Sequence, residues 1–192
     1  MVVVAFLNYA SVVPPYLYYT VYTGGLMVPG AIAWRVSSAG CLADVGLSWE
    51  NISGQLRDFV LGGVVLLGSG ALIFHLFFKS FHHYYIFSLP RGSNLFYLLY
   101  VQVVLVAFPE EFLFRGYLQA RLMELWGSPV GAVLGSAGIF AFCHLVFQGW
   151  MGGLVFFPAL VFGWLRQRTG SIFPSTFLHG LANVELFLFF GR

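Results

Sequence analysis

The sequence is poor in charged residues, and this shortage limits the class of protein that it can encode. Asp, Glu, Lys and Arg make up 8% of the 192 residues, whereas a soluble domain has about 25%. Eight of the nine cationic residues are Arg, and they are scattered along the chain. No basic stretch is present that would indicate nucleic-acid or anionic-lipid binding. With a mean hydropathy of +0.86, the chain is predicted to be a membrane protein that binds no nucleic acid.

Cysteine and nucleophile motifs are also scarce. The two cysteines, Cys41 and Cys143, do not suggest a disulfide framework. Cys143 directly precedes His144, and neighbouring residues on a helix point about 100° apart, so they form a poor thiolate–imidazole pair. No GxSxG run is present. A serine or cysteine nucleophile is therefore not expected. Residues 1–10 are apolar without a positively charged leader, so we expect them to be a retained first span.

Long apolar runs fill most of the chain. Because a helical span needs about 20 residues, the sequence has room for six or seven spans, and we predict an all-α, polytopic transmembrane helical bundle. The expected helices cover residues 59–78, 95–125, 129–147, 154–165 and 172–190, and residues 1–36 form one kinked helix or two short ones. Residues 36–57 are the most polar stretch and are expected to be a loop or interfacial segment. We divide this single integral domain into N-terminal spans, 1–94, and a membrane core, 95–192.

Two adjacent acids interrupt the apolar run between Leu95 and Leu118. Glu110 and Glu111 lie in its middle, followed by Arg115. A charged residue at the centre of a bilayer costs about 2.5–3.5 kcal/mol on insertion scales, so such a cluster indicates a functional site by default. The structural alternative is an ion pair between Glu111 and Arg115, one helical turn apart. That pair would leave Glu110 without a partner.

Polar and aromatic residues recur four residues apart on three expected helices. The pairs are Glu111 and Arg115, Phe140 and His144, and His179 and Asn183. Residues at this spacing are offset by only about 40° around a helix. Each pair can therefore face the interior of the bundle while the other faces meet lipid. We predict that the polar members of these pairs, together with Glu110, converge in one cavity.

Such a cavity suits hydrolysis of a carbonyl compound. A buried carboxylate can take a proton from water near neutral pH, and a neighbouring imidazole can hold the same water. A second imidazole and a carboxamide can donate hydrogen bonds to the oxyanion that forms. Spacing alone does not decide which glutamate is the base. Ser69 and Ser136 lie in glycine-rich apolar surroundings that are typical of close helix packing.

The three motifs resemble those of a known family. Glu110-Glu111-Phe-Leu-Phe-Arg115 is similar to the EExxxR motif of the CAAX-protease and bacteriocin-processing family of intramembrane endopeptidases. Phe140-Ala-Phe-Cys-His144 resembles its FxxxH motif, and His179-Gly-Leu-Ala-Asn183 resembles its HxxxN motif. The motifs occur in the family's order, each within an apolar run.

The resemblance implies a glutamate-dependent protease with an all-helical membrane fold and no cofactor or metal. Glu110 and His144 would activate water, and His179 and Asn183 would form the oxyanion hole. Glu111, Arg115 and Phe140 would support this geometry. The substrate would be a membrane-associated protein or peptide, and a C-terminal tail or anchor is a candidate.

Family members differ in substrate, from prenylated CAAX tails to the anchors removed by the sorting branch, the myxosortases. This compact chain is more similar to prokaryotic members, which implies a multi-pass protein of the prokaryotic inner membrane. Residues 1–94 match nothing specific in the family, so substrate selection is expected there.

Two other functions are compatible with the residues. A metal-dependent hydrolase would use the Glu and His side chains as ligands, although no HExxH motif is present and Asn183 is a poor zinc ligand. A non-enzymatic membrane scaffold, immunity factor or small transporter would use the charged cavity for binding or for proton transfer.

Overall fold

The computed structural model describes residues 15–37, 41–78 and 94–190, and every regular element in these ranges is helical. The expected all-α class is therefore confirmed. The elements are α2 (Pro15–Ser37), α3 (Ile52–Ile73) continued by η1 (Phe74–Phe78), a long helix over residues 95–126, α7 (Pro129–Gln148), η4 (Trp150–Val155), α8 (Phe156–Thr169) and α9 (Phe173–Phe190). The expected first span over residues 1–10 lies outside the described residues, as do residues 79–93.

The long helix changes its winding several times. It consists of α4 (Leu95–Tyr100), η2 (Val101–Ala107), α5 (Phe108–Glu111), η3 (Phe112–Leu118) and α6 (Gln119–Trp126), of which η2 and η3 are π-helical. In η2 the N–H of Phe108 donates to the carbonyl of Val103, five residues earlier. The Asn94 side chain caps the first turn by accepting from the N–H of Tyr97 at 2.8 Å.

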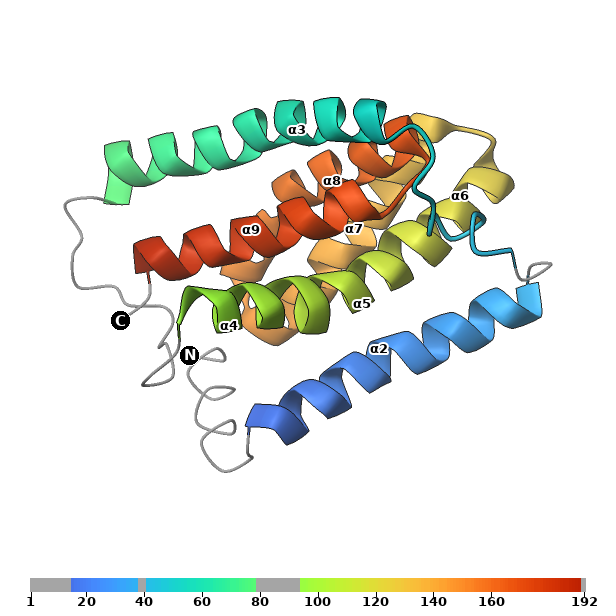
Figure 1. Ribbon diagram of the computed structural model, residues 1–192, viewed down its shortest axis with the longest axis horizontal. Helices are drawn as coiled ribbons and strands as arrows, with labels where there is room; N and C mark the ends of the chain where they lie inside the picture. Colours follow the sequence, from blue (N-terminus) through green and yellow to red (C-terminus); the bar gives the residue numbers. More distant parts are fainter. Residues whose placement is uncertain (1–14, 38–40, 79–93, 191–192) are drawn as a thin grey trace.

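The long helix lies between α2 on one side and α7, α8 and α9 on the other, and α3 packs on the outside of α8 and α9 (Figure 1). α9 packs against η2, α8 and α3, while α2 contacts η2, α5 and η3 from another side. α7 packs against α6 and α8. The segment over residues 101–118 is thus covered by α2, α7, α8 and α9. The adjacent acids at 110 and 111 lie in the middle of this covered segment, where water has little access.

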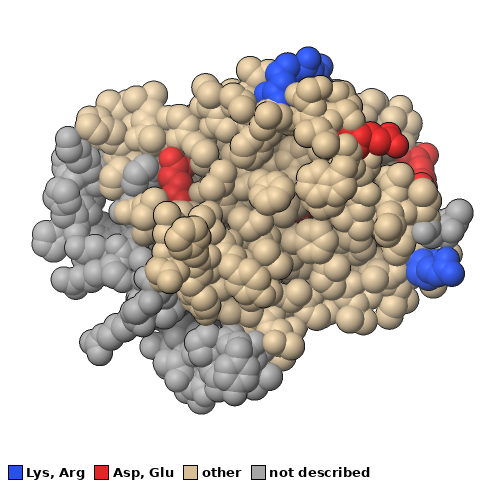
Figure 2. Space-filling view, in the orientation of Figure 1, with Lys and Arg blue, Asp and Glu red and all other residues tan. Residues whose placement is uncertain are grey.

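The outer surface is suited to a membrane. Three helices of the described residues are long and apolar enough to span a bilayer: Ile52–Leu76, Leu95–Trp126 and Pro129–Gln148. In the most apolar 18-residue window of the first helix only 6% of the residues are buried, and in that of the second helix 44% are buried. On the face shown in Figure 2, charged side chains lie near the margins and other residue types form the broad area between them. The apolar side chains of α3 therefore face outward, and the full number of spans stays a prediction.

The first residues of α3 differ from the expectation. We expected a loop or interfacial segment up to Arg57 and a span from residue 59, but the helix α3 already begins at Ile52, where the Asn51 side chain accepts from the N–H of Gly54 at 3.2 Å. The buried carboxylate of Asp58 accepts from Arg57 at 2.9 Å and from Arg168 of α8 at 3.3 Å. The two guanidinium groups compensate the negative charge of Asp58. The polar first turns of α3 are therefore stable as part of the helix.

Candidate active site

A proline shapes the backbone beside the two acids. Pro109 lacks an N–H, so it cannot donate to the carbonyl of Leu105, four residues earlier. That carbonyl accepts a hydrogen bond of 2.8 Å from the hydroxyl of Thr23 on α2. The α-helical turn with Pro109 lies between the π-helical segments η2 and η3, and π-bulges are frequent at functional sites. This local geometry connects α2 to the segment that carries the carboxylates.

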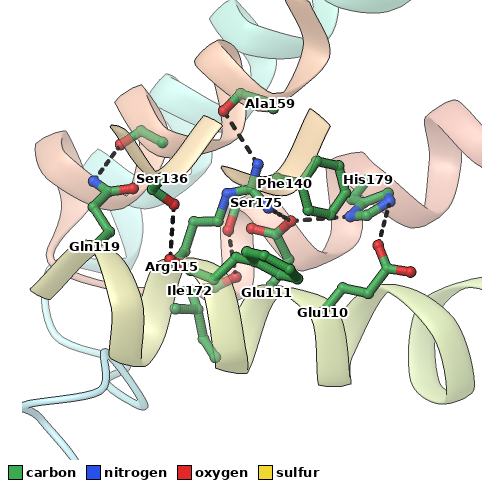
Figure 3. Close-up of polar contacts among 12 residues, drawn as sticks. Glu110, Glu111, Arg115, Gln119, Ser136, Phe140, Ala159, Ile172, Ser175 and His179 are labelled. Carbon is green, nitrogen blue, oxygen red and sulfur yellow. Dashed lines mark hydrogen bonds and ion pairs between the residues drawn. The ribbon is translucent and has the colours of Figure 1, made fainter. Parts of the chain in front are cut away.

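Glu111 is completely buried, and its two carboxylate oxygens differ: Oε1 has two partners, whereas Oε2 has no hydrogen-bond partner among the described residues. Its Oε1 atom lies 3.0 Å from Nη1 of Arg115, and both side chains are 0% exposed. The same oxygen lies 2.9 Å from Nδ1 of His179. Because a carboxylate only accepts hydrogen bonds, Nδ1 of His179 is the donor. The ion pair with Arg115 is therefore present, and His179 of α9 extends it (Figure 3).

Glu110 has a different environment from its neighbour. Its Oε1 atom accepts a hydrogen bond from the hydroxyl of Tyr22 on α2. Its Oε2 atom lies 3.6 Å from Nε2 of His179 and has no hydrogen-bond partner among the described residues. The local spacing offered no partner for Glu110, and both of its neighbours come from other helices. The sequence analysis missed Tyr22, because nothing in the sequence relates it to a residue 88 positions away.

Arg115 also binds α8 and two aromatic rings. Its Nη2 atom donates to the carbonyl of Ala159 at 3.2 Å, and the guanidinium carbon lies 4.5 Å from the centroid of the Phe140 ring. One turn further, the amide of Gln119 donates to the carbonyl of Gly163 at 3.0 Å. The two donors are four residues apart on the long helix, and the two acceptors are four residues apart on α8. The two contacts together attach the long helix to α8 (Figure 3).

The ring of His179 is fixed by aromatic contacts as well as by the carboxylates. It stacks on Phe162 with a centroid distance of 4.7 Å and an interplanar angle of 15°. The His179 and Phe140 rings also form a T-shaped contact with a centroid distance of 5.8 Å and an interplanar angle of 84°. With Nδ1 bound to Glu111, the ring presents its Nε2 atom on the side of Glu110.

His144 is not joined to the carboxylate cluster directly. Its Nδ1 atom lies 3.0 Å from the carbonyl of Phe140, which only accepts, so Nδ1 donates and the neutral ring keeps Nε2 as an acceptor. The ring lies 4.3 Å from the Phe140 ring. Over the described ranges, no hydrogen bond or ion pair links His144 to either glutamate. Phe140 contacts His144 as well as His179 and Arg115 of the cluster.

Asn183 binds Gln102, a residue that was not among the expected site residues. Its Nδ2 atom donates to Oε1 of Gln102 at 3.1 Å, and Gln102 is 5% exposed. Gln102 is the one amide residue in the apolar run between residues 95 and 109, and this isolation was a usable signal. The residues expected to converge thus lie in two groups, a cluster of Glu110, Glu111, Arg115 and His179 and a pair of Asn183 with Gln102, and over the described residues no hydrogen bond or ion pair links His144 to either group.

A close helix contact keeps these two groups together. A Cβ atom on Gly180 of α9 would lie 2.4 Å from Cγ2 and 2.9 Å from Cα of Val103 in η2. The absence of a side chain at Gly180 therefore allows α9 to approach η2 closely. His179 and Asn183 flank this contact on α9, and Gln102 precedes Val103 on η2.

The geometry defines a helical membrane protein with a buried, acid-rich polar site. In the parts of the chain that the structure describes, no three His, Cys, Asp or Glu side chains are arranged to hold a metal ion. Two carboxylate oxygens without a hydrogen-bond partner among the described residues, Oε2 of Glu110 and Oε2 of Glu111, lie among apolar helices together with two oriented imidazoles and one carboxamide. Such an arrangement can accept a proton and donate hydrogen bonds to a developing negative charge.

Part of the chain matches a known family model. Residues 92–184, just under half of the chain, match the model described as "Type II CAAX prenyl endopeptidase Rce1-like", and the chain is similar to that family over this part. The resemblance drawn from the three motifs is thereby confirmed, whereas its prokaryotic branch stays a prediction. The family points to a CAAX-type protease with a membrane-associated peptide or protein as substrate. Comparisons with curated proteins and with solved structures found no match.

Proposed function

We propose that the chain is an intramembrane endopeptidase that uses Glu110 to activate water. The carrying observation is the environment of Glu110. Its Oε1 atom is bound by Tyr22, and its Oε2 atom is buried, unpartnered among the described residues and 3.6 Å from His179. A positioned carboxylate of this kind is a candidate general base. Glu111, which is already bound to Arg115 and His179, is less suited to this role.

The proposed reaction begins with a water molecule held by Glu110 and His144. Oε2 of Glu110 takes one proton as the water oxygen attacks the peptide carbonyl, whose π electrons move onto the carbonyl oxygen. The C–N bond then breaks, and the protonated Glu110 gives its proton to the leaving amine. Nε2 of His144 accepts the second hydrogen bond of the water, a role that its Nδ1 contact with Phe140 supports by fixing the tautomer.

His179 and Asn183 are proposed to stabilise the oxyanion. Because Nδ1 of His179 donates to Glu111, its Nε2 atom carries a proton only in the imidazolium form. In that form Nε2 would donate a hydrogen bond to the oxyanion. The amide of Asn183 supplies the second donor.

The proposed substrate is a membrane-associated protein or peptide cleaved near the apolar interior, and a C-terminal tail or anchor fits this description. We propose a multi-pass protein of a prokaryotic inner membrane, because three helices can span a bilayer and the outer faces are apolar. Residues 1–94 are proposed to contribute to substrate selection.

The test compares protein termini in cells. A deletion strain is rescued with wild-type protein, with Glu110→Gln or with Glu124→Gln, all at matched expression. Glu124 lies on the same long helix but is exposed, so it is the control. Mass spectrometry of membrane and secreted proteins is expected to show specific termini with the wild type and the control. These termini should be absent with Glu110→Gln.

Identical termini and identical phenotypes in all three strains would contradict the protease and favour the scaffold or transporter. Turnover of a substrate identified in this way is then measured with purified protein in the presence of a strong chelator. Unchanged turnover is expected, whereas its loss, with recovery on adding metal, would favour the metal-dependent hydrolase.

A further inference from the structure

Gln102 holds the side-chain amide of Asn183 in the structure. The contact joins Nδ2 of Asn183 on α9 to Oε1 of Gln102 on η2 at 3.1 Å. Gln102 is buried, and it lies outside the three motifs. Gln102 and the proposed base, Glu110, belong to the same continuous helix. The contact therefore connects the proposed oxyanion donor to the helix that carries the base.

The orientation of a carboxamide matters for an oxyanion hole. The nitrogen and oxygen of Asn183 have nearly the same shape, but only the nitrogen donates hydrogen bonds. A flipped amide would present its oxygen to the developing negative charge and repel it. The amide nitrogen has two hydrogens, so one can bind Gln102 while the other remains for the substrate oxygen. In the structure Gln102 presents its carbonyl oxygen to Asn183, so the contact is made in the orientation in which Asn183 donates.

The position of the pair is fixed by its surroundings. The close approach of Gly180 to Val103 lies immediately beside it and sets the distance between α9 and η2. His179, the other proposed oxyanion donor, is one helical turn before Asn183 and is held by Glu111 at 2.9 Å. Each proposed donor is thus held by a residue of the long helix: His179 by Glu111 and Asn183 by Gln102.

We infer that Gln102 is a positioning residue that orients the Asn183 carboxamide for oxyanion stabilisation. The inference rests on the proposed protease function. Because Gln102 acts only through Asn183, its removal should matter only when Asn183 is present. Its effect should fall on kcat, because the oxyanion develops in the transition state.

The test is a kinetic double-mutant cycle with Gln102→Leu and Asn183→Ala on a peptide whose cleavage the wild type catalyses. Gln102→Leu alone is expected to lower kcat about 10-fold to 100-fold with KM nearly unchanged, since a small misplacement can cost about 100-fold. Asn183→Ala alone is expected to lower kcat about 100-fold to 1,000-fold. In the Asn183→Ala background, Gln102→Leu should have no further effect.

Equal fold losses from Gln102→Leu in both backgrounds would overturn the inference, as would wild-type kcat in the single variant. The melting temperature of each variant in detergent is measured in parallel. A lower melting temperature with the non-additive pattern intact still supports positioning, because a merely structural loss would be the same in both backgrounds. Glu110→Gln is included throughout. Activity in Glu110→Gln would instead contradict the proposed function, so the two failures are distinguishable.

Discussion

At the scale of single residues, the two adjacent carboxylates differ in their partners. Oε1 of Glu111 binds a guanidinium and an imidazole, whereas Oε1 of Glu110 accepts from the hydroxyl of Tyr22 and its Oε2 lies 3.6 Å from Nε2 of His179. Oε2 of each glutamate has no hydrogen-bond partner among the described residues. A carboxylate that is paired with a guanidinium is less suited to take a proton from water. The proposed division into a base, Glu110, and a supporting acid, Glu111, follows from this difference.

Replacing Tyr22 with Phe tests whether the hydroxyl orients Glu110. The substitution removes one oxygen and leaves the ring, so it leaves Oε1 of Glu110 without its donor and free to rotate. We expect kcat for peptide cleavage to fall about 10-fold with a smaller change in KM, because misplacement of a reacting group lowers the rate. Tyr100→Phe, at an exposed residue of the long helix, is the control and should retain wild-type kcat. Unchanged kcat in Tyr22→Phe would show that Glu110 needs no such donor.

Replacing Arg115 with Met tests the energetics of the buried ion pair. Removing one partner leaves the Glu111 carboxylate buried beside His179 alone, and breaking such a pair costs about 3–5 kcal/mol. A reversible denaturant titration in detergent measures this loss in the free energy of unfolding. Glu124→Gln breaks the exposed pair between Arg121 and Glu124 and is expected to cost under about 1 kcal/mol. Equal losses in the two variants would contradict a special role for burial.

At the scale of helices, the contact between α9 and η2 determines how the proposed donors face the base. Gly180→Ala would place a Cβ within 2.4 Å of Val103, so the two helices must separate. Peptide cleavage is expected to fall at least about 10-fold, because His179 and Asn183 both move with α9. Gly138→Ala on α7, where a Cβ meets nothing within 4 Å, is the matched control. Equal activity in the two variants would show that this helix approach does not set the site.

The sequence predicted local relations within a helix better than relations between helices. The i,i+4 spacing offered an ion pair of Glu111 with Arg115 as the structural alternative, and the structure contains this pair because helix geometry alone brings the two residues together. The donors to Glu110 and Gln102 come from Tyr22 and Asn183, which lie 88 and 81 residues away. No spacing rule relates residues so far apart. The start of α3 was misplaced for the same reason, since Asp58 is compensated by Arg168, 110 residues later.

At the scale of the whole molecule, polarity is distributed in the reverse of a soluble protein. The long helix at the centre carries buried Glu, Arg and Gln side chains, while α3 presents apolar side chains outward. Val64 lies at the middle of the candidate span Ile52–Leu76 and is 70% exposed. If this surface meets lipid, its apolar character is required for insertion. If it met water, a charge there would be harmless or would improve solubility.

Replacing Val64 with Lys distinguishes these two environments for the outer face. A Lys at the centre of a transmembrane helix costs about 2.5–3.5 kcal/mol on insertion scales, so the variant is expected to be depleted from the carbonate-resistant membrane fraction. Val64→Leu preserves the apolar character and should match the wild type. Membrane levels of Val64→Lys equal to those of Val64→Leu, with both proteins folded, would contradict a lipid-facing α3. Loss of membrane protein in Val64→Lys alone would instead indicate that the surface of α3 is in contact with the hydrocarbon core.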